Sequence, residues 1–211
     1  MSSSAAAVVY VHGLWMPGVE SALLLRRLSA RGLRPYVFSY RSVFEPVTDI
    51  AAALRQMLAR IDAPQVHLLG HSLGGVVIQR FLERYRMSQT GRAVFLGSPC
   101  AGSQVARRLA RWSFGRRLLG RAAVDELLVQ RERRWESDRE LGIIAGTVPL
   151  GFGRLLLTFR EANDGTVAVS ETAVPGAKYR LCLPVTHTGL LLSARVARET
   201  GNFFEHGRFG P

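Results

Sequence analysis

The sequence predicts an α/β fold: a doubly wound, mostly parallel sheet of six strands flanked by helices. Short runs rich in Val, Leu, Tyr and Phe alternate along the chain with longer stretches of helical spacing. Several of these short runs are nearly continuous in apolar residues, as expected of strands that are covered on both faces. Strands that alternate with helices in this way are typically parallel, because each helix returns the chain to the start of the next strand.

The elements follow in order along the chain. The six expected strands are AVVYVH (7–12), PYVFSY (35–40), VHLLGH (66–71), AVFLGS (93–98), GIIAGT (142–147) and KYRLCL (178–183). Helices are expected at 19–31, 47–61, 73–86 and 188–200. The second of these carries an apolar stripe of Ile50, Leu54, Met57, Leu58 and Ile61. Ligands of such sheets bind beyond the carboxyl ends of the strands, so we expect the chemistry at that edge.

Length and composition fit a globular protein. The 211 residues suit a single domain spanning 1–211, and the composition is 47% hydrophobic and 21% charged. No apolar run approaches the roughly 18 residues that a membrane span requires. The first residues, MSSSAAAVVYVHG, lack the positive start of an export signal. We therefore expect a cytoplasmic location.

The charge balance is strongly basic. The formal net charge is +12, and Lys178 is the only lysine, so the positive charge is nearly all arginine. Such a chain can favour nucleic acid, an anionic membrane surface or acidic substrates. Zinc-finger spacing, an RNP-like motif and a helix-turn-helix are all missing, which disfavours nucleic acid. A solvated arginine-rich surface is the simpler alternative. No His/Cys cluster suggests a metal site.

The stretch Gly70-His71-Ser72-Leu73-Gly74 lies between an expected strand and an expected helix. In this setting G-x-S-x-G is a nucleophile elbow, a strained turn that presents the serine. The amide of Leu73 lies at the start of the following helix, where the helix dipole favours a developing oxyanion. A second oxyanion donor is expected from the amide of Leu14, since Gly13 permits an unusual turn after the first strand.

An activated serine requires a base, and His187 is the best candidate. His187 lies in LPVTHTGLL, between the last strand and the last helix, and therefore at the carboxyl edge of the sheet. His12 is set aside because its His-Gly pair is structural and the expected chain order is nucleophile, acid, base. His206 lies in a Gly-flanked tail that is expected to fray. His71 should point away from its neighbour Ser72, and His67 lies inside a strand.

The base needs an acid to orient it. Asp164 lies in the turn ANDGTVAVSE, between the fifth and sixth expected strands. Asp125 and Asp138 fall in a charged helical stretch, where a solvated surface is the ordinary explanation. Glu161 and Glu171 are nearby alternatives. Asn-Asp-Gly is also good turn chemistry, so this segment can serve as a plain turn too.

Five stretches carry a resemblance: VVYVHGLW, VHLLGHSLGGVV, AVFLGSP, NDGTV and THTGLL. In this order they resemble the α/β-hydrolase superfamily, and within it the small bacterial lipases and esterases with a minimal six-stranded sheet. The resemblance implies a catalytic triad of Ser72, Asp164 and His187, with the Leu14 and Leu73 amides as the oxyanion hole. It also implies hydrolysis of carboxylic esters, often acyl or lipid esters, without metal or organic cofactor.

The superfold hosts many reactions, so the substrate stays open. A thioesterase, an amidase or an acyltransferase uses the same triad. A non-catalytic hydrolase-fold module that binds lipid or a partner is the alternative from another functional class.

Two segments are longer than the minimal pattern needs. Segment 101–140 carries six arginines and no acidic residue between Gln104 and Val124. Val105, Leu109 and Trp112 are expected to form an apolar stripe beside this basic face, suited to a lid or to an anionic membrane surface. An ordinary pair of crossover helices is the alternative. Segment 148–160 either lines an acyl pocket or is buried filler, and together the two segments predict a cap that prefers medium or long acyl chains.

Overall fold

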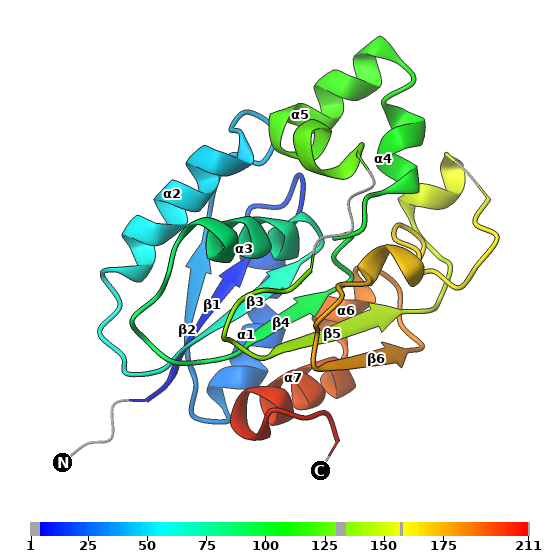
Figure 1. The fold of residues 1–211 in the computed structure, drawn as a ribbon. Coiled ribbons are helices and arrows are strands. Elements are labelled where there is room, and N and C mark those ends of the chain that lie inside the picture. The colour runs from blue at the N-terminus through cyan, green and yellow to red at the C-terminus, as the bar shows by residue number, and fades with distance from the viewer. Residues whose placement is uncertain (1–4, 130–133, 157, 211) are drawn as a thin grey trace.

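The computed structural model describes residues 5–129, 134–156 and 158–210. Its centre is a six-stranded sheet in the order β2-β1-β3-β4-β5-β6 (Figure 1). All neighbouring strands are parallel, so the predicted sheet is confirmed. The strands are β1 (Ala7–Val11), β2 (Arg34–Phe38), β3 (Val66–His71), β4 (Ala93–Leu96), β5 (Leu141–Gly146) and β6 (Tyr179–Leu183).

Burial along the strands follows their place in the sheet. The four inner strands β1, β3, β4 and β5 are buried at every residue, whereas the edge strands β2 and β6 are partly exposed. This explains why the inner strands have continuous apolar sequences. Strand β4 ends two residues earlier than predicted, because Gly97 takes a positive φ of 54° that leaves the strand conformation.

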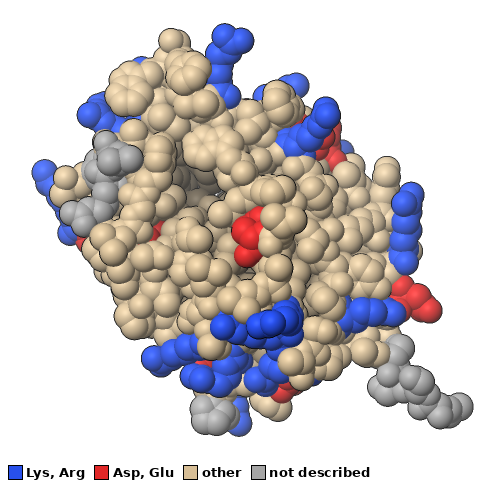
Figure 2. Space-filling view, turned by 180° about the vertical axis from the view of Figure 1, so that it is seen from behind, with Lys and Arg blue, Asp and Glu red and all other residues tan. Residues whose placement is uncertain are grey.

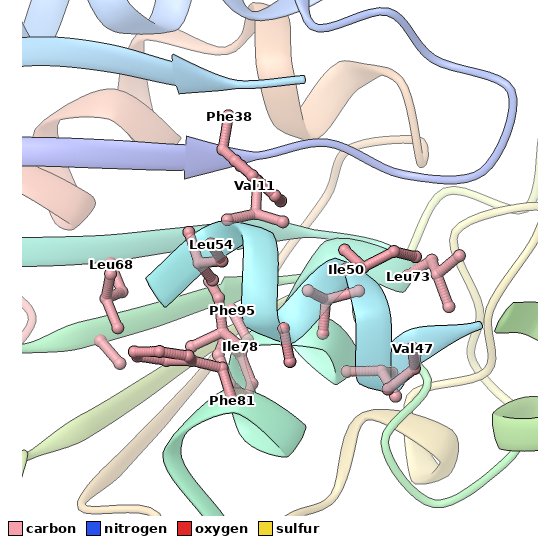
Figure 3. Close-up of a cluster of buried hydrophobic side chains, with 14 of the residues drawn as sticks. Val11, Phe38, Val47, Ile50, Leu54, Leu68, Leu73, Ile78, Phe81 and Phe95 are labelled. Atoms are coloured by element: carbon pink, nitrogen blue, oxygen red, sulfur yellow. The ribbon is translucent and has the colours of Figure 1, made fainter. Parts of the chain in front are cut away.

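Helices cover both faces of the sheet (Figure 1). One face carries α2 (Val47–Leu58) and α3 (Leu73–Arg84), and the other carries α1 (Ala22–Ser29), α6 (Gly189–Leu192) and α7 (Ala194–His206). Short 3-10 helices lie at η1 (Val19–Ser21), η2 (Phe152–Leu155) and η3 (Ser170–Thr172). Figure 3 shows the hydrophobic core on the face that carries α2 and α3, where Ile50 and Leu54 of α2 lie among side chains of α3 and the sheet.

The C-terminal helix differs from its prediction. Ser193 adopts an extended conformation and separates α6 from α7, and its hydroxyl caps the new helix by accepting from the Val196 amide at 3.3 Å. Helix α7 then continues to His206 and ends at Gly207, which has a φ of 69°. The expectation that His206 lies in a frayed tail is therefore wrong. Buried Phe203 and Phe204 hold the last turn against the sheet.

The segment after β4 forms α4 (Gln104–Leu109) and α5 (Ser113–Leu127). Helix α4 ends before Trp112, so the predicted stripe of Val105, Leu109 and Trp112 is wrong: the first two are buried, while Trp112 is the extended residue just before α5 and is 56% exposed. The close crossing of the two helices depends on Gly115, where a Cβ would lie 2.0 Å from the Leu109 carbonyl oxygen.

Helix α5 is interrupted at Gly120, which has a φ of 71°. A Cβ there would lie 2.1 Å from the carbonyl oxygen of Val43, and the Arg121 amide donates to the same oxygen at 3.1 Å. The interruption therefore joins α5 to the loop before α2. Of the helices in the described ranges, none combines the length and the apolar content that a bilayer span needs.

Candidate active site

Ser72 occupies a strained turn between β3 and α3. Its φ of 53° and ψ of −124° are rare for a residue with a side chain. The turn is possible only because its neighbours are glycines. A Cβ on Gly70 would lie 2.5 Å from the Gly75 Cα, and one on Gly74 would lie 2.0 Å from the Val11 carbonyl oxygen. The spacing of small residues in the sequence therefore has a direct steric cause.

The loop after β1 lies against this turn. A Cβ on Gly13 would lie 3.0 Å from the Cβ of Ser72. His12 fixes the loop: its ring stacks on Tyr40 at 4.2 Å, its Nε2 accepts from the Tyr40 amide at 3.2 Å, and its Nδ1 donates to the Gly13 carbonyl at 2.8 Å. Burial lowers the pKa of His12, so the ring stays neutral in this tautomer. His12 is thus engaged in holding the loop.

The amides of Leu14 and Leu73 are available to a ligand. Both residues line the cavity that contains Ser72. Across the residues that the structure describes, neither amide donates a hydrogen bond to another group of the protein. Two unengaged N–H groups beside a presented hydroxyl can stabilise a negatively charged oxygen.

Trp15, the next residue of this loop, connects it to α5. Trp15 has a φ of 60°, and its amide donates to the Ser42 hydroxyl at 3.2 Å. Its indole Nε1 donates to the Leu118 carbonyl at 2.9 Å. Because Gly120 interrupts α5 nearby, the Leu118 carbonyl can accept this hydrogen bond from Trp15, a residue far away in the sequence. This contact was not predicted, since nothing local in the sequence marks it.

His187 and Asp164 form a close pair. The His187 Nδ1 lies 2.6 Å from Asp164 Oδ2, and the His187 amide donates to the Asp164 carbonyl at 2.8 Å. The second carboxylate oxygen of Asp164 accepts from the amides of Thr166 at 2.9 Å and Val167 at 2.7 Å. Asp164 is 1% exposed. The carboxylate accepts from Nδ1–H, which leaves the Nε2 lone pair of His187 available.

Gly97 makes room for this pair. With its positive φ, a Cβ at this position would lie 2.9 Å from Asp164 Oδ2, 3.2 Å from His187 Nδ1 and 2.7 Å from a methyl group of Leu190. Gly97 was not predicted as a site residue. Its only local signal is a glycine directly after an apolar strand.

His71 contacts both the ring and the backbone of His187. It is fully buried, its ring lies 4.7 Å from the His187 ring, and its Nε2 lies 3.2 Å from the His187 carbonyl oxygen. Burial and the neighbouring His187 hold the pKa of His71 well below its ordinary value. The neutral ring therefore donates from Nε2–H to the His187 backbone. Its side chain is occupied with this segment of the chain.

The other acidic candidates lie elsewhere. Asp125 is exposed on α5, and Asp138 is exposed in a loop near Arg86 rather than in a helix as predicted. Exposed Glu161 accepts from the Gln104 side chain at 3.4 Å. Glu171 is buried and accepts from the amides of Ala168 and Gln104, which joins the acid loop to the start of α4. Burial raises the pKa of Glu171 to about 7.

A cavity of about 250 Å³ contains both Ser72 and His187. No hydrogen bond between the Ser72 hydroxyl and His187 occurs within the described ranges; such contacts are often long before a substrate binds. Residues from three segments supply most of the apolar wall: Val105, Ala106 and Leu109 from α4, Leu119 and Leu127 from α5, and Leu150, Gly151 and Phe152 at the start of η2. Leu150 and Phe152 are also exposed, so this part of 148–160 is not buried filler.

Comparisons with known proteins agree with the fold. The model of the alpha/beta hydrolase family matches residues 8–198. A mature lipase from Bacillus licheniformis superposes with a TM-score of 0.73 at 19% identity, covering 89% of this chain and 87% of that one. A pyrethroid hydrolase has a TM-score of 0.66 at 15% identity, covering 96% and 98%. A bottromycin epimerase has a TM-score of 0.60 at 16% identity, covering 97% and 92%. No curated protein matches the sequence.

Proposed function

This chain belongs to the alpha/beta hydrolase family, and from that premise we propose that it is a serine hydrolase that cleaves carboxylic esters through an acyl-enzyme at Ser72. The observation that carries the proposal is the 2.6 Å contact between His187 Nδ1 and Asp164 Oδ2, beside the strained turn of Ser72. The strained backbone of Ser72 costs free energy, and Asp164 places a carboxylate in the protein interior. Packing of the core alone requires neither feature.

The pair defines the direction of proton transfer. Asp164 holds Nδ1–H of His187, so Nε2 can take the proton from the Ser72 hydroxyl as its oxygen attacks the ester carbonyl carbon. The Leu14 and Leu73 amides stabilise the resulting oxyanion. The C–O bond to the alcohol then breaks, and His187 returns the proton to the departing oxygen. Water, deprotonated by the same histidine, cleaves the acyl-enzyme and releases the acid.

The cavity favours an acyl chain of medium length. Its walls are mostly apolar, and its volume of about 250 Å³ is slightly below the roughly 300–1,000 Å³ typical of drug-sized ligands. A series of nitrophenyl esters measures how activity depends on acyl-chain length. Activity should rise from acetate toward medium acyl chains, and a maximum at acetate with steep loss by octanoate contradicts an acyl-binding cap.

The same residues could serve an acyltransferase or a thioesterase. Matched ester, thioester and amide substrates separate the hydrolase classes, and an added alcohol acceptor reveals transfer as a new ester product. We expect the highest kcat/KM for the ester and water as the main acceptor. A thioester preference or a dominant transfer product rejects this proposal while leaving the roles of Ser72 and His187 intact.

A further inference from the structure

The outer side of α4 and α5 carries exposed apolar and basic residues, here called the cap surface: Arg111, Trp112, Phe114, Arg116, Arg117 and Leu118. Phe114 is 68% exposed, and Leu118 lies one turn further along the same side of α5. The apolar strip continues to the cavity mouth, because Leu118 binds Trp15 and the Trp15 ring meets Phe152 edge-on at 6.1 Å. A continuous exposed apolar strip of this kind marks an interaction surface.

In the described part of the chain, some arginines pair with acidic residues and others, those of the cap surface among them, do not. Elsewhere Arg31, Arg80 and Arg92 each form an ion pair of 3.0 Å or less with a glutamate. By contrast, Arg111, Arg116 and Arg117 pair with no acidic residue among those that the structure describes. The sequence from 104 to 124 contains no acid, and the next one, Asp125, lines a groove with Arg116 and Arg117 but forms no ion pair with either among the described residues. Their positive charge is therefore available to an anionic partner.

Arg116 and Arg117 also border a shallow groove of about 440 Å³ beside exposed Phe44. Figure 2 shows Lys and Arg side chains along the upper margin of the molecule, near a hollow bordered mainly by uncharged side chains. Positive charge next to exposed aromatic rings matches the membrane interface, where rings sit at headgroup level and basic groups meet lipid phosphates.

We propose that the cap surface binds an anionic lipid bilayer. Trp112 and Phe114 enter the headgroup region, while Arg111, Arg116 and Arg117 pair with lipid phosphates. This orientation turns the mouth of the cavity toward the bilayer, since Leu118 of the cap surface is hydrogen-bonded to Trp15, which lines the cavity. The proposal does not depend on whether Ser72 is the nucleophile, because it concerns binding alone.

Sedimentation with vesicles tests the proposal on the full-length protein and, to prevent lipid hydrolysis, on Ser72→Ala. We expect binding to vesicles of phosphatidylglycerol mixed with phosphatidylcholine, weak binding to pure phosphatidylcholine, and loss of binding as salt is added. Equal binding to both vesicle types overturns the proposal, as does absence of binding.

Charge variants locate the surface. Arg116→Gln/Arg117→Gln should weaken binding about thirtyfold, because each basic residue near an anionic membrane contributes a factor of about five. Arg26→Gln/Arg195→Gln removes the same charge from exposed positions on α1 and α7 and should change binding less than about twofold. Equal losses in the two double variants mean that net charge alone attracts the protein, and they overturn the proposal.

Two further variants keep the test decisive. Arg116→Lys/Arg117→Lys retains the charge and should retain binding, which separates electrostatics from misfolding of the glutamine variant. Trp112→Ser/Phe114→Ser should also weaken binding, and this loss should be independent of salt concentration, because the contribution that it removes is apolar. A duplex oligonucleotide serves as the competing partner: if it binds through Arg116 and Arg117 while vesicles do not bind, the surface is a nucleic-acid site and the proposal is rejected.

Discussion

The edge of the sheet and the cap differ in how their residues are constrained. At the edge, Ser72, Gly97, Asp164 and His187 are held by backbone contacts and buried hydrogen bonds that leave little freedom. The cap, formed by α4 and α5, is broken at Gly120 and exposes aromatic and arginine side chains. The contacts that join the two regions include the Trp15–Leu118 hydrogen bond and the Glu171–Gln104 contact.

We infer from this difference that the two regions have separate functions. We propose that the edge fixes the geometry on which the chemistry depends, and that the cap selects the substrates that reach this edge. Substitutions at the edge should therefore act on kcat, and those in the cap on substrate range, surface binding or stability. The following predictions test that separation, beginning with the largest effect.

The largest effect is expected at the base. His187→Ala should lower kcat for a soluble nitrophenyl ester by roughly 10⁴- to 10⁶-fold, as when other triad members are removed. His206→Ala, at the exposed end of α7, is the matched control and should leave kcat unchanged. Circular dichroism should report an intact fold for both variants. A His187→Ala enzyme with near wild-type turnover removes this histidine from the mechanism.

The next effect concerns Gly97. An added methyl group would press on Asp164, His187 and Leu190, so Gly97→Ala should lower kcat about a hundredfold or more. Gly32→Ala is the control, because Gly32 also has a positive φ, of 85°, but a Cβ there would meet nothing within 4 Å. Both variants carry backbone strain of about 1 kcal/mol. Similar kcat values for the two variants would mean that strain, not displacement of the pair, decides the outcome.

A smaller effect is expected where the regions meet. Trp15→Phe keeps an aromatic ring but removes the donor to the Leu118 carbonyl, a bond contributing about 1 kcal/mol. If this bond positions the Leu14 amide, kcat should fall about five- to tenfold with KM little changed. Trp112→Phe, on the cap surface, should leave both constants unaltered for a soluble ester. A change confined to KM in Trp15→Phe means that Trp15 only lines the cavity.

The smallest effect concerns stability and its dependence on pH. The pKa of Glu171 in the folded protein, about 7, lies above its ordinary 4.5, so the folded state binds this proton more tightly than the unfolded chain does. Stability from Glu171 is full below about pH 4.5 and declines as the pH rises to 7, by roughly 3 kcal/mol at most.

Glu171→Gln tests this directly by thermal unfolding. The neutral amide should flatten the fall of Tm between pH 5 and 7.5, because no proton is lost from this position. Exposed Glu161→Gln should keep the wild-type slope. An unchanged slope in Glu171→Gln assigns the pH dependence to other groups.

Much of the edge could be predicted because its constraints are local. The strand of residues 66–71, the glycines around Ser72 and the turn at Asp164 each leave a signature within a few positions. The contacts of Gly97 and Trp15 could not be predicted, because they join segments far apart in the sequence. His206 was misassigned because Gly207 and Gly210 resemble a frayed tail, whereas the first of them ends a helix that Phe203 and Phe204 anchor.

The most direct measurement of the central claim is covalent labelling with a fluorophosphonate, followed by peptide mapping. The probe reacts with an activated serine, so the account predicts one modified residue, Ser72, and a much slower reaction in His187→Ala. Ser103, which also lines the cavity, and buried Ser98 serve as internal controls that should stay unmodified. Absence of labelling, or a label on Ser103 in place of Ser72, contradicts the account.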